Sequence, residues 1–310
     1  MNYPYANGII SAIDERLFGR SQYHKLSKID KVDFVKGLID FGYGREGTTL
    51  EERIASELTE LRKFLNNISP NRRLTDLFFL EIDAVNIKSA YKKKVFNARI
   101  DVFASDGNIG AEALHQAIFF DDYTMLDKNT KDLLKDISEV LQGVDNPRRL
   151  SMIVDRIIYD YIFKSLPLGF DSALKVYYQT TVDIKNIVTM VRIKALNWEF
   201  AYFEEMFLAG GLIPLSLFKT VIGSDESRLL KEYYEEKLVK GLMIFKNNNN
   251  IDEFERYLEQ LIINIMKKYR YDSFGIGPII YYYLAKQAEA NNIRLLYSGE
   301  ENAVGDLTEY

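Results

Sequence analysis

The sequence contains no cysteine, only two histidines, and few of the residues that interrupt helices. Without cysteine the chain cannot form a disulfide scaffold, a thiolate zinc or iron–sulfur site, or a cysteine nucleophile, and the absence also fits a reducing compartment. His24 and His115 have no catalytic or metal-ligating partner nearby in the sequence, so we expect neither to act as a base. The 6 prolines and 18 glycines are a small share of 310 residues, which favours long helices.

Charge and hydropathy exclude two further classes of protein. The 40 basic and 45 acidic residues give a net charge of −5, and phosphate binding needs a basic excess, so we expect no nucleic-acid partner. The longest uncharged runs, 206–218 and 273–285, have 13 residues each. A membrane-spanning helix needs about 20 apolar residues. No apolar stretch precedes Asp14, so we also expect no export signal. The sequence therefore predicts a soluble protein that meets a membrane only peripherally.

The sequence does contain apolar side chains at helical spacing. Three clear amphipathic stripes occur, at 54–65, 150–161 and 251–265. Each stripe follows a residue type that caps helices: Thr49, Asn146 and Asn250. No convincing series of alternating strands is present. These patterns predict an all-α protein in which the many tyrosines and phenylalanines pack between helices.

One short element occurs three times. It consists of an acid, two variable residues, an asparagine and an isoleucine, at 83–87, 183–187 and 289–293. Glycine-containing segments at 107–110 and 210–214 each precede a short apolar helix, predicted at 113–120 and 215–222. Because several elements recur in the same order about every 100 residues, we predict three helical modules related by a pseudo-three-fold axis, each with a small core of its own.

The repeated acid–asparagine element has two interpretations. The acid and the amide lie three residues apart on one helix face, where they could bind a ligand. Alternatively, the acid lies near a helix start, the asparagine bonds to a neighbouring helix or loop, and the isoleucine enters the core. We favour the structural interpretation, because all three modules share the element.

Motifs that carry chemistry are absent from the sequence. There is no phosphate-binding G-x-x-x-x-G-K-[ST], no G-x-G-x-x-G opening a helix after a strand, no H-E-x-x-H and no G-x-S-x-G. Asp121 and Asp122 begin like the metal-binding box of helical prenyl-transfer enzymes, but Met125 stands at its fifth position. We therefore predict no catalytic, cofactor-binding or metal-binding residues and no cofactor.

Charged runs leave a choice between solvated faces and docking surfaces. Two short runs are basic, at 92–94 and 148–149, and one is acidic, at 232–236. We favour solvated helix faces, and the alternative is docking of an oppositely charged partner. The acidic tail, 299–310, is expected to be partly mobile.

The order and spacing of these elements resemble those of the C subunit of V-type (V/A-type) ATPases, which is similar to the d subunit of eukaryotic vacuolar ATPases. The resemblance covers essentially the whole chain and rests on these segments: 5–7, 14–17, 83–88, 146–147 with 155–156, 183–194, 210–213 and 283–294. The family often carries arginines in the first helix, where this chain has Ile9 and Ser11. The resemblance therefore assigns no partner contact at those positions.

The resemblance implies a funnel-shaped body of three modules: 71–165, 166–268, and 1–70 together with 269–310. It implies a non-catalytic central-stalk (rotor) component that couples the central shaft to the membrane ring, while other subunits carry ATP synthesis or hydrolysis and hydrogen ion transport. The implied partners are shaft and ring subunits, with no nucleic acid and no small-molecule substrate. The implied location is cytoplasmic, attached peripherally to the membrane through the complex.

Two other functions remain open from the residues alone. One is a helical prenyl-transfer-type enzyme that uses Asp121 and Asp122 with magnesium. The other is a general helical adaptor.

Overall fold

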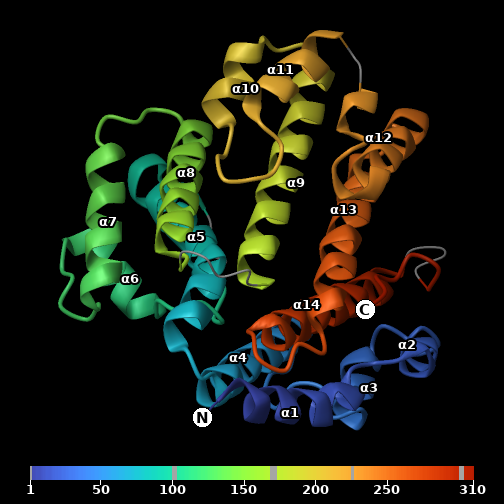
Figure 1. The fold of residues 1–310 in the computed structure, drawn as a ribbon. Coiled ribbons are helices and arrows are strands. Elements are labelled where there is room, and N and C mark those ends of the chain that lie inside the picture. Colours follow the sequence, from blue (N-terminus) through green and yellow to red (C-terminus); the bar gives the residue numbers. More distant parts are fainter. Residues whose placement is uncertain (1, 100–102, 168–172, 225–226, 300–303) are drawn as a thin grey trace.

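The structure is a computed structural model that describes residues 2–99, 103–167, 173–224, 227–299 and 304–310. Within these ranges every regular element is a helix, and none is a strand. The predicted all-α class is therefore confirmed. The first helices (blue) and the last helix (red) lie side by side in Figure 1, although they stand at opposite ends of the sequence.

The helices follow one another in this order. The first part of the chain contains α1 (Tyr3–Ile13), η1 (Asp14–Arg16), α2 (Arg20–Leu26), α3 (Phe34–Asp40) and α4 (Leu50–Ile68). The next part contains α5 (Arg72–Phe96), α6 (Ala111–Phe120), α7 (Lys128–Val140) and α8 (Pro147–Ser165). The last part contains α9 (Ala173–Ala195), α10 (Phe200–Met206), α11 (Leu215–Ser224), η2 (Ser227–Leu230), η3 (Tyr234–Glu236), α12 (Lys237–Asn248), α13 (Ile251–Met266), η4 (Lys267–Tyr269) and α14 (Gly277–Ser298).

The predicted caps begin three long helices. The Thr49 hydroxyl accepts from the N–H of Glu52, whose side chain accepts in return from the N–H of Thr49. The Asn146 and Asn250 side chains accept from first-turn N–H groups of α8 and α13. Because these caps satisfy amides that have no partner within the helix, the three helix starts could be read from the sequence.

Three long helices, α5, α9 and α14, each pack against a short helix and another long helix. The long helix α5 packs against α6 and α8, and the long helix α9 packs against α11 and α13. The long helix α14 packs against α2 and α4, and also against α1. The helix α14 also packs against α9 and α13, so its partners come from both ends of the sequence, whereas α5 and α9 pack mainly against segments that follow them.

The buried apolar side chains of the described ranges form three clusters of unequal size. The largest contains residues of α1, α4 to α9, α13 and α14. A second is built from α9 to α13, and a third from α2 to α4 and α14. The expectation of three small cores in place of one large core is therefore wrong. The first halves of α9 and α14 (residues 173–182 and 279–288) join the large cluster with α5, and only their second halves enter the smaller clusters.

Aromatic side chains tie the large cluster together. The rings of Phe78 and Phe79 on α5 meet the ring of Tyr283 on α14 edge-on, with centroids 5.4 and 4.6 Å apart. Phe78 also meets Tyr177 on α9 at 5.2 Å. Edge-to-face pairs of this kind stabilise by about 0.5–1.5 kcal/mol each beyond area burial, so they fix the three long helices against one another.

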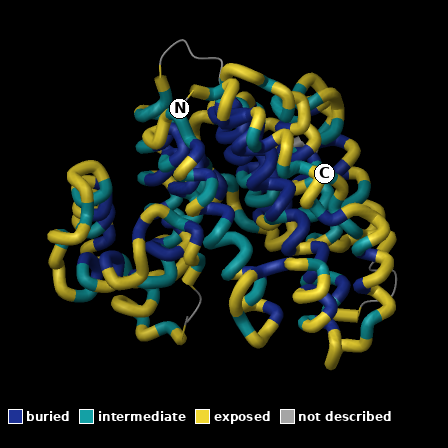
Figure 2. Tube along the Cα trace, turned by 90° about the horizontal axis from the view of Figure 1, so that it is seen from below, coloured by how far each residue is buried: buried dark blue, intermediate teal, exposed yellow. Residues whose placement is uncertain are grey.

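Buried residues line the inner sides of the helices in Figure 2, and exposed residues lie along the loops and outer faces. Among the helices of the described ranges, none combines the length and the apolar character that crossing a membrane requires.

Candidate interaction site

The acid–asparagine element of α5 binds the segment that follows this helix. The Asn86 side chain pairs with the backbone of Ala104: its amide donates to the carbonyl (2.9 Å), and its oxygen accepts from the N–H (2.9 Å). The Asp83 carboxylate accepts from the backbone N–H groups of Asn108 (2.8 Å) and Ile109 (2.9 Å). The two side chains therefore hold two points of the loop between α5 and α6.

The element of α9 makes the same set of bonds. The Asn186 amide donates to the carbonyl of Leu208 (2.8 Å), and its oxygen accepts from the N–H of Leu208 (3.0 Å). The Asp183 carboxylate accepts from the N–H groups of Leu212 (2.8 Å) and Ile213 (3.1 Å).

The element of α14 joins the two ends of the sequence. Asn292 pairs with the backbone of Thr308, with distances of 2.9 Å to its carbonyl and 2.8 Å to its N–H. The Glu289 carboxylate accepts from the N–H of Phe18 at 2.6 Å, across 271 positions of the sequence. For the elements of α5 and α9, a single segment further along the chain supplies all the bonded backbone groups. For the element of α14, these groups come from two segments at opposite ends of the sequence.

These contacts support part of the structural interpretation and correct another part. The three asparagines bond to connecting segments, and the three isoleucines of the element are fully buried, as that interpretation expects. The acids, however, lie in the middle of their helices, and the expectation that they lie near a helix start is wrong. A mid-helix acid finds no free amides on its own helix, so its N–H donors come from a loop.

Burial dominates the electrostatics of these acids. It raises the pKa of Asp83 to about 6, although three hydrogen bonds from residues 108 and 109 oppose the shift. Burial likewise raises the pKa values of Asp183 and Glu289. Gly107 and Gly211 approach the two aspartates so closely that a Cβ at either position would collide with the carboxylate. The carboxylates are therefore enclosed by the protein itself.

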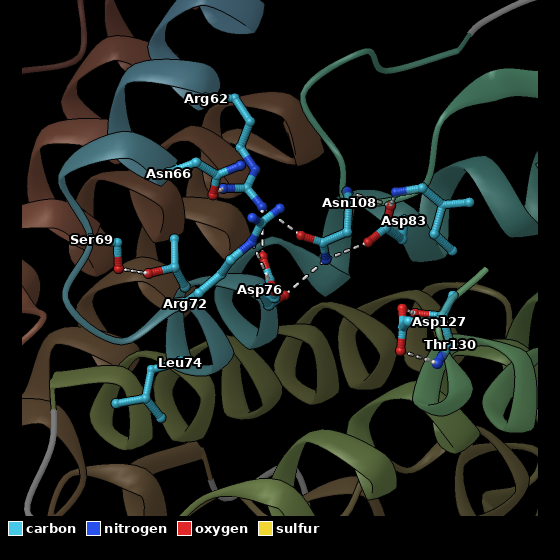
Figure 3. Close-up of polar contacts among 12 residues, drawn as sticks. Arg62, Asn66, Ser69, Arg72, Leu74, Asp76, Asp83, Asn108, Asp127 and Thr130 are labelled. Atoms are coloured by element: carbon cyan, nitrogen blue, oxygen red, sulfur yellow. Dashed lines mark hydrogen bonds and ion pairs between the residues drawn. The ribbon is translucent and has the colours of Figure 1, made fainter. Parts of the chain in front are cut away.

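Arg62 connects α4 to the element of α5, as Figure 3 shows. Its guanidinium donates to the side-chain oxygens of Asn108 (2.6 Å) and Asp76 (3.0 Å), and Asn108 donates in turn to Asp83 (2.6 Å). The guanidinium also lies 3.9 Å from the centroid of the Phe79 ring. Because Arg62 is only 5% exposed, this network fixes α4 against α5.

The residues considered for catalysis are dispersed and exposed. His24 and His115 lie on the surface of α2 and α6, and His115 stacks on Phe119 at 4.8 Å. Asp121 ends α6 in a left-handed conformation, and the Asp122 carboxylate accepts from the N–H of Thr124 (2.9 Å). Within the described ranges, no group of three or more acidic or histidine side chains is arranged to hold a metal.

The charged runs contact neighbouring parts of the same chain. The Lys94 ammonium donates to the carbonyl of Ile118 (2.5 Å), and the Arg148 guanidinium lies 4.5 Å from the centre of the Trp198 ring. The Glu235 carboxylate accepts from two lysine side chains, at 2.9 and 3.2 Å.

The described part of the acidic tail is hydrogen-bonded to other parts of the chain. The backbone of Glu309 pairs with the side chain of Gln260 on α13, with two bonds of 2.7 Å. The Tyr310 hydroxyl donates to the carbonyl of Phe18 (2.6 Å). Residues 304–310 thus join α13, α14 and the segment before α2, while 300–303 lie outside the described residues.

Two adjoining cavities lie between the long helices. One, of about 430 Å³, is open to solvent and lined mainly by α5, α8, α9 and α13. The other, of about 250 Å³, is also open and is lined mainly by α4, α9, α13 and α14. Three residues line both cavities: Tyr177, Glu259 and Ile262. The cavities are therefore neighbours, and their walls come from helices far apart in the sequence.

A partly buried ion pair lies in the wall of the larger cavity. The Glu81 carboxylate on α5 accepts from Lys185 on α9 (3.1 Å) and from the hydroxyls of Tyr159 (2.7 Å) and Tyr177 (3.0 Å). Burial raises the pKa of Glu81, but Lys185 and the two hydroxyls outweigh that effect and lower the pKa. Sequence reasoning missed this cluster, because its members come from three helices and form no motif.

These features define an all-helical protein whose buried polar groups hold its own loops and whose long helices line two adjoining cavities. The family model of the ATP synthase (C/AC39) subunit matches residues 6–306. The chain belongs to this family.

Curated proteins agree with this assignment over nearly the full length. The chain is 21% identical to the C subunit of the V-type sodium ATPase of Enterococcus hirae, with 97% of this chain and 95% of that protein aligned. It is 21% identical to the C subunit of the A-type ATP synthase of Methanocaldococcus jannaschii, over 96% of this chain and 82% of that protein. It is 23% identical to the corresponding protein of Haloferax volcanii, over 97% and 94%. The predicted resemblance to the C subunit of V/A-type ATPases is confirmed.

Proposed function

We propose that this chain is a non-catalytic central-stalk component of a V/A-type ATPase, and that it couples the rotating shaft to the membrane ring. Family membership over residues 6–306 carries the proposal, since the matched relatives are named as subunits of such complexes. ATP synthesis or hydrolysis and ion transport are assigned to other subunits. The chain is then attached to the membrane peripherally, on the cytoplasmic side.

The proposal includes three modules that form a funnel: 71–165, 166–268, and 1–70 with 269–310. Three observations support this division. Each of α5, α9 and α14 packs against a long helix and at least one short helix assigned to the same module, although α14 also contacts α9 and α13. Each acid–asparagine element bonds within its own module. In the third module these bonds cross from α14 to the start of the chain, at Phe18.

The two cavities are the proposed binding site of the shaft. Their walls come from helices assigned to all three modules, so an element seated there would contact all three at once. Torque transfer requires a stiff wall, and the long helices around the cavity are packed by aromatic rings and by the cluster around Glu81. We propose that the shaft binds at these cavities and that the membrane ring binds to another face of the protein.

Co-purification tests the proposal. The tagged chain, extracted gently from native membranes, is expected to bring down both shaft and ring subunits of the ATPase. Recovery of the chain free of ATPase subunits, under conditions that keep the complex intact, would contradict the proposal. Recovery of the shaft without the ring would favour the general adaptor instead.

A further inference from the structure

One carboxylate at the junction of the two cavities has no bonded partner among the residues that the structure describes. Glu259 lines both cavities and is exposed. Within the described ranges its side chain makes no hydrogen bond and no ion pair. Protein that surrounds part of the Glu259 side chain desolvates it and raises its pKa, and the neighbouring Glu255 raises the pKa further, while Arg256 offsets these effects only in part.

The other charges of the cavity walls are paired. Two ion pairs join charges of the walls themselves: Glu81 with Lys185 (3.1 Å), and Glu255 with Arg192 (2.5 Å). Two further pairs use a partner outside the walls: Asp155 with Lys88 (2.6 Å), and Arg294 with Glu51 (2.8 Å). The charge left uncompensated at the junction is therefore a single negative one.

The rest of the lining is largely apolar. The side chains that face the cavities come from ridges of neighbouring helices and include these: Leu58, Met152, Ile184, Leu258, Ile262 and Leu284. Grooves between helices that are lined in this way accept the apolar face of another helix. An occupant that also carries a cation would compensate the carboxylate that the chain leaves unpaired.

We propose that Glu259 recognises the occupant of these cavities, and that the occupant is an amphipathic partner helix presenting one lysine or arginine among apolar side chains. The inference rests on the proposed function, in which this partner is the shaft. The inference adds the chemistry of the contact. Apolar packing provides most of the buried interface area, and the ion pair between Glu259 and a cation of the partner fixes the orientation of the bound helix.

Binding of purified shaft subunits of the same ATPase to purified variants of this chain tests the inference. We expect Glu259→Gln to weaken binding at low salt about tenfold and Glu259→Lys to weaken it at least a hundredfold, because the second change opposes like charges. Glu139→Lys is the matched control: Glu139 is exposed on α7 and lines neither cavity. This control should bind like the unaltered chain. Replacing the facing basic residue of the shaft by Glu should restore binding to Glu259→Lys.

The outcomes separate the two proposals. If the unaltered chain does not bind the shaft subunits, the proposed function fails, and the inference fails with it. If the unaltered chain binds but both Glu259 variants bind equally well, the inference alone is overturned. Equal weakening by Glu139→Lys would also overturn it, because the effect would then follow net charge and not this site.

Discussion

Replacing Asn186 by leucine removes one buried amide and tests the scaffold role of the repeated element. Leucine is branched like asparagine but is larger and has no polar atom, so it leaves the N–H and the carbonyl of Leu208 without the bonds of 3.0 and 2.8 Å that Asn186 provides. Asn186 is 1% exposed and Leu208 is 7% exposed, so water cannot easily replace the amide.

The magnitude follows from the two groups that lose their partner. A buried polar group left unpaired costs about 1–3 kcal/mol. Two such groups, partly offset by the added apolar contact, predict a loss of about 2–4 kcal/mol. The backbone partners of Asn86 and Asn292, Ala104 and Thr308, are only partly buried, so water can restore some of their bonds. We therefore expect Asn86→Leu and Asn292→Leu to lose less, about 1–2 kcal/mol each.

Thermal and urea unfolding of the isolated protein measure the effect. We expect the control variant to have the highest Tm and Asn86→Leu and Asn292→Leu to have lower values. The Tm of Asn186→Leu should be the lowest, by several degrees. Asn247→Leu is the control, because Asn247 is an exposed residue of α12. An unchanged Tm for Asn186→Leu would refute the scaffold role. A larger loss at Asn86 than at Asn186 would refute the reasoning from partner burial.

Three further changes have expected outcomes. Gly211→Ala should lower the Tm because the added Cβ collides with the Asp183 carboxylate, whereas Gly110→Ala, with open space around it, should not. Replacing both acids at 121–122 by Asn should leave the Tm and shaft binding unchanged, and calorimetry should detect no magnesium binding before or after the change. The raised pKa of Asp83, about 6, means that the folded state holds a proton that the unfolded state releases near pH 4. The unfolding free energy of the unaltered chain minus that of Asp83→Asn should therefore fall as pH rises from about 4 to about 6, and a flat difference would contradict this assignment.

Local signals in the sequence were sufficient to predict that the chain forms helices and where several of those helices begin. The caps at Thr49, Asn146 and Asn250 act on amides two or three positions away, so residue type and spacing determine them. The all-α class follows from apolar periodicity, which depends only on neighbours along one helix.

The repeated element was visible in the sequence, but its bonds were not. The partners of Asn86 and Asn186 lie 18 and 22 positions further on, and their backbone groups carry no signature in residue type. The partner of Glu289 lies 271 positions away, at Phe18. No local rule connects positions so distant, since only the packing of α14 against α2 and α4 brings them together.

The sequence by itself determined that this protein is helical, that one short acid–asparagine element recurs, and that it lacks the motifs of catalysis. These properties depend on composition and on spacings within a helix, which chain geometry alone enforces. Only the tertiary structure decided that the largest core is shared by α5, α9 and α14, and that Glu259 stands unpaired where two cavities meet. Both depend on how side chains from different helices approach in space, because burial and pairing of charge are set by neighbours that the sequence places far apart.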